Sequence, residues 1–595
     1  MTSDGKITSH GNSIRKTTQF ELPVIKDVVP NAYDIYPIHS TNDAPINIGY
    51  PALAEALTRF RCIKIDGYVG TLFDQVRQNL TQSLSELNIV ARWINVEDAL
   101  LPPELISSKL IPFLGGDDPI FGKLCPFTID DFFDFDMLES MELPADEAVT
   151  IYYGIGAELI RRPGCVVFFD IPKNEIQFRA RAGTIKNFGA SDAVDHKRMY
   201  KRFYFVDWPV LNRHLRSIIR DIDIFVDGQR SNAITWMTGD HWRDSINKLT
   251  SRPIRARPWF EPGVWGGTWI KDKIDGIPLN VENYAWSFEL IYPENGVILG
   301  YNGVMLETTF SSVLFLASEN IMGIDAKTYA DYFPIRFDFL DTFNGANLSV
   351  QCHPLVDYMR QHFGEEITQE ETYYILDTQP EAKVYLGFHN GVTRETFGEA
   401  LRKSRDTASP LDIDQYVQTF AANKHDLFLI PPGTVHASGR GSLVLEISST
   451  PYIYTFKMYD WVRLDLDGKP RPLNIDRGLD NLVFERSGEK VHSELISRVI
   501  ELEANSDFEL YHLPTHRQHL YDIHRYVIKT EVEVMTNGKA HVLSLVEGER
   551  IVIVLNDESF IYNYAETILI AATTIRYKLV SLSDKPAIVV KAFIK

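Results

Sequence analysis

The stretch Ser349-Val-Gln-Cys-His-Pro354 carries the pattern from which both the fold and a candidate site can be worked out. Successive side chains of a β-strand point to opposite faces, so Ser349, Gln351 and His353 share one face while Cys352 points to the other. An amide and an imidazole would then point together into the interior of a β-barrel. The spacing therefore predicts a strand that presents polar side chains to an enclosed site.

Two later stretches offer matching chemistry. Glu371 opens a run of aromatic and β-branched residues, Glu-Thr-Tyr-Tyr-Ile-Leu, that is typical of a strand. His436 follows a Pro-Pro-Gly turn placed directly after the apolar strand predicted over residues 426–430. Imidazole nitrogens and a carboxylate are the ligands that Zn²⁺ or a similar divalent ion prefers. Each residue alone would usually be structural, but together Gln351, His353, Glu371 and His436 predict one metal site.

The order of these motifs resembles class I mannose-6-phosphate isomerases, which are zinc enzymes of the cupin superfamily. The shared pieces are Gln-x-His-Pro, the glutamate before x-Tyr-Tyr-Ile-Leu, and Pro-x-Gly-Thr-Val-His-Ala. Further matches are Trp265-Gly-Gly-Thr268, Phe333-Pro-Ile-Arg-Phe-Asp-Phe-Leu340, Leu443-Val-Leu-Glu-Ile447 and Met458-Tyr-Asp-Trp461. The similarity covers about residues 256–595 and is densest between residues 330 and 461.

Carried over to this chain, the resemblance implies that Gln351, His353, Glu371 and His436 hold Zn²⁺ or another divalent metal. It also implies an enzyme that interconverts mannose 6-phosphate and fructose 6-phosphate through an enediol. Glu446 stands at the position of an active-site glutamate and is a candidate base, or a residue that orients a ligand. Lys457 is the candidate cation for the substrate phosphate or a developing oxyanion, and Ser349 could hydrogen-bond the substrate.

Two positions depart from the family pattern. The family usually has a lysine where this chain has Gln369, and an arginine where it has Lys457. Lysine keeps the charge of arginine but loses its two-pronged geometry, and glutamine loses the charge altogether. A relocated cation, or a different sugar phosphate, would be compatible with both changes. Two alternatives therefore stay open: a non-catalytic protein that binds a sugar or sugar phosphate, and an isomerase of a different hexose.

The first half of the chain has an α/β pattern. Strands are predicted over residues 61–66, 165–170, 202–207 and 223–227, with helices over residues 72–87 and 208–221. A strand that ends in Ile-Asp-Gly before a helix resembles the opening of P-loop kinases. A working phosphate loop needs Gly-x4-Gly-Lys-Ser/Thr, but Leu72, Phe73 and Asp74 occupy the last three positions. We therefore expect a kinase-like fold without kinase chemistry.

The expected fold class is multidomain, an α/β part followed by a mainly β part. The predicted order is a lead-in segment (1–50), a kinase-like α/β domain (51–235), a linker (236–258) with exposed arginines, a metal-binding cupin domain (259–470) and a metal-free cupin domain (471–595). Short strands separated by turns in the second half are typical of barrels and sandwiches.

Composition narrows the partners and the compartment. The chain has 595 residues and a net charge of −20, which disfavours binding to nucleic acid or to an anionic membrane surface. No apolar run approaches the length of a membrane span, and the first residues lack the apolar core of a signal peptide. The four cysteines have no paired spacing, which suits a reducing cytoplasm. The expected partner is a small sugar phosphate; the oligomeric state is not determined by the sequence.

Overall fold

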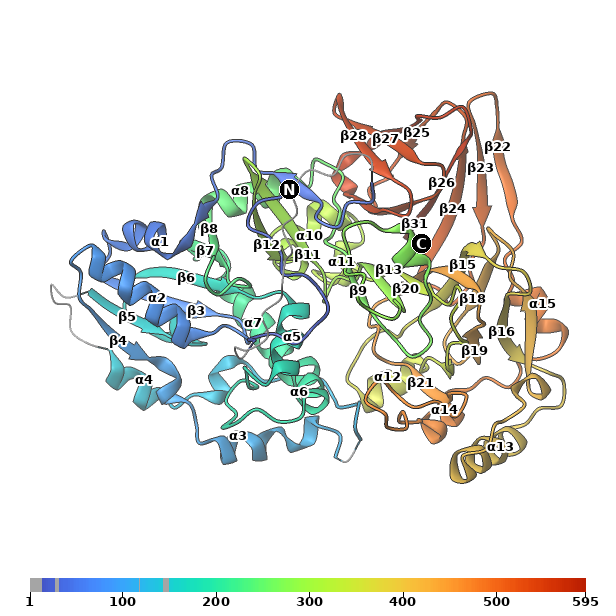
Figure 1. Ribbon diagram of the computed structural model, residues 1–595, viewed down its shortest axis with the longest axis horizontal. Helices are drawn as coiled ribbons and strands as arrows, with labels where there is room; N and C mark the ends of the chain where they lie inside the picture. Colours follow the sequence, from blue (N-terminus) through green and yellow to red (C-terminus); the bar gives the residue numbers. More distant parts are fainter. Residues whose placement is uncertain (1–12, 27–31, 117, 143–148) are drawn as a thin grey trace, which may run out of the picture.

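The computed structural model describes residues 13–26, 32–116, 118–142 and 149–595. Figure 1 shows an α/β unit built from the first half of the chain, a β-rich unit beside it, and a second β-rich unit formed by the last hundred residues. The multidomain α/β plus mainly β architecture expected from the sequence is confirmed. Among the helices of the described residues, none has the length and apolar character needed to cross a membrane.

A seven-stranded sheet forms the centre of the α/β unit. Its order is β2 (Asn47–Ile48), β8 (Thr235–Thr238), β7 (Ile224–Asp227), β6 (Cys165–Asp170), β3 (Cys62–Gly67), β5 (Val149–Tyr153) and β4 (Ala91–Asn95). The five strands from β7 to β4 run parallel, β8 pairs antiparallel with β7, and β2 pairs antiparallel with β8. Every residue of β3 and β6 is buried, which explains the continuous apolar run Cys165–Phe169 of β6; β3 buries Lys64 and Asp66 as well.

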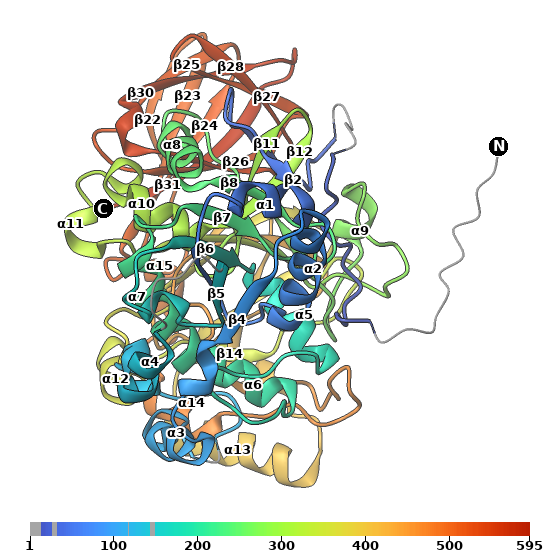
Figure 2. The same ribbon diagram turned by 90° about the vertical axis from the view of Figure 1, so that its left-hand side faces the viewer.

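Helices cover both faces of this sheet. Helices α1 (Gly49–Leu57) and α2 (Phe73–Glu86) lie on one face, and α7 (Trp208–Ile218) and α8 (Gly239–Leu249) on the other (Figure 2). The remaining helices of the unit are α3 (Pro103–Leu110), α4 (Phe135–Met141), α5 (Lys173–Ala182) and α6 (His196–Arg202). The predicted helices over 72–87 and 208–221 therefore exist with slightly shorter bounds.

Two sequence predictions about this half are wrong. The strand predicted over residues 202–207 is helical: a π-helical turn, η5 (Phe203–Asp207), joins α6 to α7. All five of its residues are buried, and a helical turn enclosed on every side produces the same apolar run as a strand. The linker predicted over 236–258 contains most of β8 and all of α8, so it belongs to the domain.

The arginines of that stretch are also not exposed. Arg255 is 2% exposed and pairs with Glu566 at 2.8 Å, and Arg257 is 8% exposed and pairs with Glu307 at 2.5 Å. A buried guanidinium requires a carboxylate partner, and both partners lie far away in the sequence. Local polarity therefore gave no sign of this burial.

The β-rich unit beside the α/β domain is built from two antiparallel sheets. One has the order β18 (Leu427–Ile430), β15 (Glu371–Thr378), β20 (Ser442–Ser449), β13 (Ile335–Asp341), β10 (Trp286–Leu290), β9 (Trp259–Glu261). The other has the order β17 (Val417–Ala421), β16 (Lys383–Phe388), β19 (His436–Ser438), β14 (Val350–Cys352), β21 (Phe456–Tyr459). Side chains of the two sheets meet in a shared interior, as the predicted barrel requires.

Helices surround this barrel. They are α9 (Trp269–Lys273), α10 (Phe310–Met322), α11 (Ala326–Tyr329), α12 (Val356–His362), α13 (Arg394–Thr407), α14 (Ile475–Asn481) and α15 (Glu489–Glu494). Because α14 contacts β14 and β21, and α15 contacts β16, residues 471–499 pack with the barrel. The boundary predicted at residue 470 therefore lies too early.

The last unit has its own hydrophobic core. One of its sheets has the order β22 (Ile500–Ala504), β23 (Phe508–Leu513), β24 (Tyr521–Ile528), β31 (Ala587–Ile594), β26 (His541–Glu547), β29 (Thr567–Ile570). The other has the order β25 (Glu531–Met535), β30 (Arg576–Ser581), β27 (Arg550–Leu555), β28 (Glu558–Asn563).

The lead-in segment joins the two halves of the chain. Strand β1 (Ile38–Ser40) pairs in parallel with β11 (Gly296–Tyr301), which pairs with β12 (Val304–Thr309). Strand β12 in turn covers the carboxyl ends of β6 and β7, because the amides of Glu307 and Thr309 donate to Asp227 and Asp170 at 2.9 and 3.1 Å. The α/β domain is therefore joined to the second half of the chain through hydrogen bonds from backbone amides of β12 to two aspartate carboxylates.

Candidate metal centre

The four predicted ligands come together between the two sheets of the barrel. Gln351 lies on β14 directly opposite His436 on β19, so their side chains share one face. His353 follows β14, and Glu371 opens β15 in the facing sheet. His353 and Glu371 are each 1% exposed and His436 is fully buried. The tertiary structure thus brings into one enclosed cluster residues that are up to 85 positions apart.

The distances within this cluster are short. Nε2 of His353 and Nε2 of His436 lie 2.6 and 2.9 Å from the same carboxylate oxygen, Oε2 of Glu371. One ligand atom from each of the three residues lies within 4.8 Å of the other two. The Gln351 amide nitrogen is 3.3 Å from Nε2 of His436, and a half-turn of that amide would direct its oxygen to the same point.

Hydrogen bonds on the far side of each ring identify the tautomers. Nδ1 of His353 faces the carbonyl of Tyr454 at 3.1 Å, and Nδ1 of His436 faces the carbonyl of Thr434 at 2.9 Å. A carbonyl only accepts, so Nδ1 carries the proton in both neutral rings and Nε2 presents a lone pair. Two lone pairs and a carboxylate then face one point. That arrangement is repulsive by itself and fits a bound cation.

The charge states also fit a metal site. Burial lowers the pKa of His353, which favours the neutral imidazole that a metal needs. Burial raises the pKa of Glu371, but His353 and His436, when they carry protons on Nε2, outweigh it through their charge and hydrogen bonds and hold the pKa well below its usual range. A bound metal ion would take the place of those protons. Two nitrogens, one carboxylate and one amide match the preferences of Zn²⁺, and they also accommodate Mn, Fe or Co.

Glu446 lies on the same interior face as Glu371. On paired strands β15 and β20, Tyr373 is opposite Glu446 and Glu371 is opposite Ser448, so all four side chains point the same way. Ser448 donates its hydroxyl to Glu446 at 2.9 Å. The hydroxyl of Tyr373 is buried without a hydrogen-bond partner among the described residues, and its ring lies 5.8 Å from that of His436.

Arg336 is the charged residue of this interior that the sequence reasoning missed. It lies on β13 with 4% exposure, forms an ion pair with Glu446, and lies 3.1 Å from Asp338. Burial raises the pKa of Asp338 to about 6, against the opposing effect of Arg336. An arginine and an aspartate two residues apart in the otherwise apolar stretch Phe333–Leu340 were the signal that could have revealed it, since a buried arginine needs a carboxylate partner.

Gln369, where the resembling family has a lysine, lies beside this arginine. With its amide oriented to satisfy both ends, the nitrogen donates to the carbonyl of Tyr452 at 2.9 Å and the oxygen accepts from Arg336 at 3.2 Å. The positive charge that Gln369 lacks is thus present next to it. Arg336 is therefore a candidate for the relocated cation that the two departures from the family pattern would allow.

Lys457 and Ser349 also point into the barrel. Lys457 on β21 is directly opposite Gln351, and its side-chain ammonium forms no hydrogen bond or ion pair with the described part of the chain. Burial, reinforced by Arg471, lowers the pKa of Lys457 to about 8. Ser349 is 1% exposed and donates to the Gln351 side-chain oxygen at 3.4 Å. Every predicted site residue therefore lies in or beside one interior.

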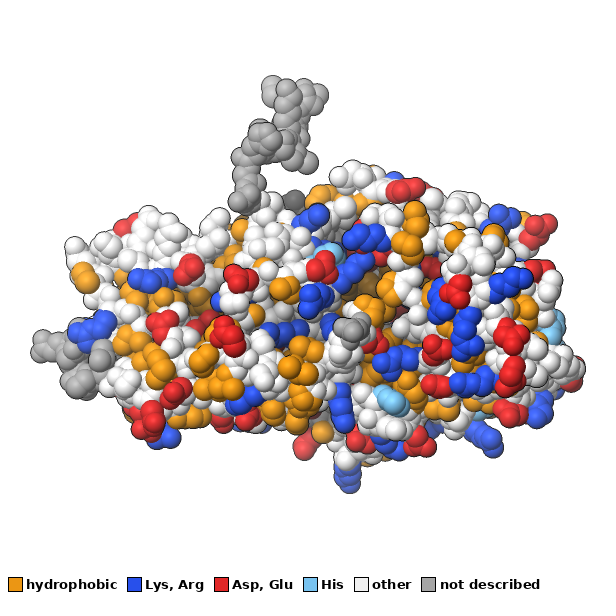
Figure 3. Space-filling view, turned by 90° about the horizontal axis from the view of Figure 1, so that it is seen from below, with side chains coloured by type: hydrophobic (Ala, Val, Ile, Leu, Met, Phe, Trp, Pro, Cys, Tyr) orange, Lys and Arg blue, Asp and Glu red, His pale blue; other side chains and the backbone are white. Residues whose placement is uncertain are grey.

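Positive charge is concentrated near Lys457. Arg463 and Arg471 both pair with the single carboxylate of Asp460, so the group of three cations keeps an excess of positive charge. In the view from below, basic side chains gather around a hollow near the middle of the molecule (Figure 3). An anionic group on a substrate would be attracted to such a place despite the overall negative charge of the chain.

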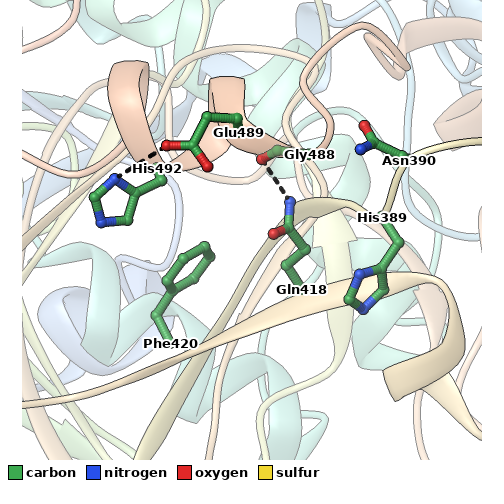
Figure 4. Close-up of a pocket in the computed structure, with 7 residues that line it drawn as sticks. All are labelled: His389, Asn390, Gln418, Phe420, Gly488, Glu489 and His492. Atoms are coloured by element: carbon green, nitrogen blue, oxygen red, sulfur yellow. Dashed lines mark hydrogen bonds and ion pairs between the residues drawn. The ribbon is translucent and has the colours of Figure 1, made fainter.

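A second pocket holds two histidines but does not form a chelate. It has a volume of about 660 Å³ and lies where β16, β17 and α15 meet. Figure 4 shows the rings of His389 and His492 on opposite sides of it, with Gln418 and Phe420 between them. His492 is 3.9 Å from the exposed carboxylate of Glu489. Its groups do not converge, unlike those around Glu371.

A cleft of about 630 Å³ lies at the end of β3 in the α/β domain. Leu72, Phe73 and Asp74, which replace the residues of a working phosphate loop, contribute to its wall. Among its described lining residues Lys186 is the one cation, against three carboxylates, those of Asp74, Glu97 and Asp192. Such a wall would repel a triphosphate, in keeping with the expected absence of kinase chemistry. The kinase-like fold itself stays a prediction.

Comparison with known proteins supports the isomerase resemblance. The chain is 29% identical over 254 residues to mannose-6-phosphate isomerase ManA of Bacillus subtilis, covering 42% of this chain and 75% of the relative. It is 26% identical over 235 residues to mannose-6-phosphate isomerase of Streptococcus mutans, covering 39% and 69%. The chain is thus mannose-6-phosphate isomerase-like, as the sequence motifs indicated.

Two solved structures and one family model also match parts of the chain. The mannose 6-phosphate isomerase structure from Bacillus subtilis aligns with a TM-score of 0.47 at 18% identity, over 57% of this chain and 99% of its own. A mutant of phosphomannose isomerase from Salmonella typhimurium aligns with a TM-score of 0.45 at 12% identity, over 58% and 99%. Residues 49–251 match the model of a domain of unknown function, DUF8485.

Proposed function

We propose that this chain is a metal-dependent aldose–ketose isomerase of the cupin type that interconverts mannose 6-phosphate and fructose 6-phosphate. The observation that carries the proposal is the convergence of two Nε2 lone pairs and the Glu371 carboxylate on one buried point, next to a further carboxylate and a lysine. The similarity to proteins named mannose-6-phosphate isomerase supports the choice of substrate.

In this proposal Gln351, His353, Glu371 and His436 hold the divalent metal, Zn²⁺ by the preference of its donor set. When bound, such an ion supplies Lewis-acid stabilisation of negative charge on the oxygens of the substrate carbons C1 and C2. The Nδ1 hydrogen bonds of the two histidines keep their rings oriented for this task.

The protein must also move a proton between C1 and C2. Glu446 is the proposed base: it removes the carbon-bound proton to form the enediol and returns it to the neighbouring carbon. Its carboxylate is held in a fixed direction by Arg336 and Ser448, so it needs little reorganisation during the reaction. Lys457 binds the phosphate or the developing oxyanion, and Ser349 binds a substrate hydroxyl.

A non-catalytic sugar-phosphate-binding role is the second candidate. It is favoured by one observation: the carboxylate of Glu446 is engaged by a buried arginine, which competes with its use as a base. We further propose a cytoplasmic location, and a kinase-like α/β domain that lacks kinase activity.

The deciding experiment uses the purified full-length protein. Conversion of mannose 6-phosphate to fructose 6-phosphate is measured before chelation, after chelation, and after addition of Zn²⁺, Mn²⁺ or Co²⁺, with unphosphorylated mannose as the comparison. Turnover that disappears on chelation and returns with metal supports the isomerase. Tight binding of metal and sugar phosphate without turnover would instead support the non-catalytic binding role.

A further inference from the structure

A segment of the barrel, residues 450–455, passes between the candidate metal centre and the α/β domain. It connects β20 to β21, and we call it the connecting segment. On its inner side the carbonyl of Tyr454 accepts the hydrogen bond from Nδ1 of His353 at 3.1 Å. The carbonyl of Tyr452 accepts from the amide of Gln369 at 2.9 Å. The backbone of the connecting segment thus orients a metal ligand and the glutamine next to it.

The connecting segment also lies next to Arg336. The guanidinium lies 6.0 Å from the ring centre of Tyr452, within the range of a cation–π contact. The oxygen of Gln369 accepts from Arg336 at 3.2 Å, so the carbonyl of Tyr452 and this arginine are linked through one amide. A displacement of Tyr452 would therefore shift the guanidinium of Arg336 and, through their ion pair, the carboxylate of Glu446.

On its outer side the connecting segment is held by the α/β domain. The hydroxyl of Tyr200, at the end of α6, lies 3.0 Å from the hydroxyl of Tyr452. Tyr204, in the π-helical turn η5, packs edge-on against Tyr452 and Tyr454, each with ring centres 6.2 Å apart. Phe121 stacks on Tyr454 at 6.0 Å. Helix α6 lies at the border between the two units (Figure 1).

Tyr200 is itself fixed in place. Its hydroxyl donates to Glu294 at 3.3 Å, and Gln177 of α5 donates to the other oxygen of that carboxylate at 3.1 Å. Glu294 is 3% exposed, so these hydrogen bonds lie away from water, where leaving a partner unsatisfied is costly.

We propose that the α/β domain is a working part of the metal centre, with Tyr200 as a positioning residue. Tyr200 and Tyr204 hold the connecting segment, and the connecting segment orients His353 and Arg336. The domain therefore supports the site from its outer side, whether or not the domain also binds a ligand of its own. The catalytic part of this inference rests on the proposed isomerase function; the part that concerns metal binding does not.

The test uses the full-length protein with Tyr200→Phe, which removes one hydroxyl. The ring stays in contact with Trp208, whose ring centre is 5.7 Å away. The matched control is Tyr50→Phe, which removes a hydroxyl that bonds the carbonyl of Ser231 at 3.1 Å and the side chain of Asn79, both within the α/β domain. Three quantities are measured: the Co²⁺ dissociation constant from its visible absorption, amide hydrogen exchange in the connecting segment, and kcat and KM.

Tyr200→Phe should weaken Co²⁺ binding by roughly 10-fold, the lower end of the effect of losing support behind a metal ligand. Exchange in the connecting segment should be faster, and kcat should fall more than KM rises. Tyr452→Phe removes only the bond shared by the two tyrosines and should change Co²⁺ affinity and exchange in the same direction. The double variant should be no worse than Tyr200→Phe, which removes this bond and the one to Glu294.

The inference is overturned if Tyr200→Phe matches Tyr50→Phe in Co²⁺ affinity, in the cobalt spectrum and in exchange. If the wild-type protein shows no isomerase turnover, the proposed function fails. The cobalt and exchange measurements would still decide whether the α/β domain supports the metal centre.

Discussion

His436→Ala removes one of the two nitrogens of the candidate metal centre. It also removes the 2.9 Å contact to Glu371, which is left with His353 alone. A metal that binds only the folded protein at 100 times its Kd stabilises it by about 2.7 kcal/mol. For a domain of 150–250 residues this corresponds to a rise in Tm of roughly 5–11 °C. We expect that rise in the wild-type protein and its loss in His436→Ala.

The assay is differential scanning calorimetry of chelated protein with and without Zn²⁺, together with direct measurement of bound metal. His425→Ala is the matched control, because His425 also pairs with a carboxylate, that of Glu547 at 2.8 Å, but lies outside the centre. This control should lose some stability and keep the full metal-dependent shift.

A metal-dependent rise of the same size in His436→Ala would refute the reasoning, because the metal would then be bound by other residues. The absence of any rise in the wild-type protein would refute it as well. In either case the close approach of two imidazoles to Glu371 would be a structural hydrogen-bond cluster, and the isomerase proposal would lose its main support.

Three further changes test the roles assigned to individual groups. Lys457→Ala should raise KM for mannose 6-phosphate by about 10- to 100-fold in steady-state kinetics, which is the effect of losing a hydrogen bond to a charged group. Lys457→Arg should restore most of the affinity. Equal KM values in these two variants and the wild type would exclude Lys457 from phosphate binding. Glu446→Gln should lower kcat by about 10²- to 10⁴-fold at unchanged metal content, and an unaffected kcat would exclude it as the base. Burial raises the pKa of Glu294 from its ordinary 4.5 to about 8. Between these two pH values the folded state keeps a proton that the unfolded chain has lost, so the free energy of unfolding falls as the pH rises from about 4.5 to about 8. Glu294→Gln should remove that part of the decline between pH 5 and pH 8 in Tm measurements, and a decline as steep as that of the wild type would show that the group does not titrate there.

Much of the barrel could be predicted from local pattern. The period-two alternation around Gln351 and His353, and the strand that Glu371 opens, follow from backbone geometry that any strand imposes. In the α/β domain, strand β6 has the bounds that the sequence predicts, because a continuous apolar run flanked by turn residues leaves few alternatives.

The errors arose where burial was not encoded locally. The aromatic run of η5 was taken for a strand, since apolar runs fully enclosed by protein show no period. Arg255 and Arg257 were taken for exposed linker residues, because their carboxylate partners lie far along the chain. Arg336 differs from these two, because one carboxylate partner, Asp338, lies only two residues away, while the other, Glu446, lies on a different strand.

The sequence by itself determined the set of chemical groups: two imidazoles, a carboxylate and an amide on strands of known facing, with a lysine and a second glutamate nearby. Strand periodicity is a local property, so it can be read without coordinates. Only the tertiary structure decided that the rings present Nε2 rather than Nδ1 to Glu371, and that Arg336 lies beside Gln369. It also decided that the α/β domain touches the segment behind the metal centre. These are contacts between distant parts of the chain, set by how whole units pack together.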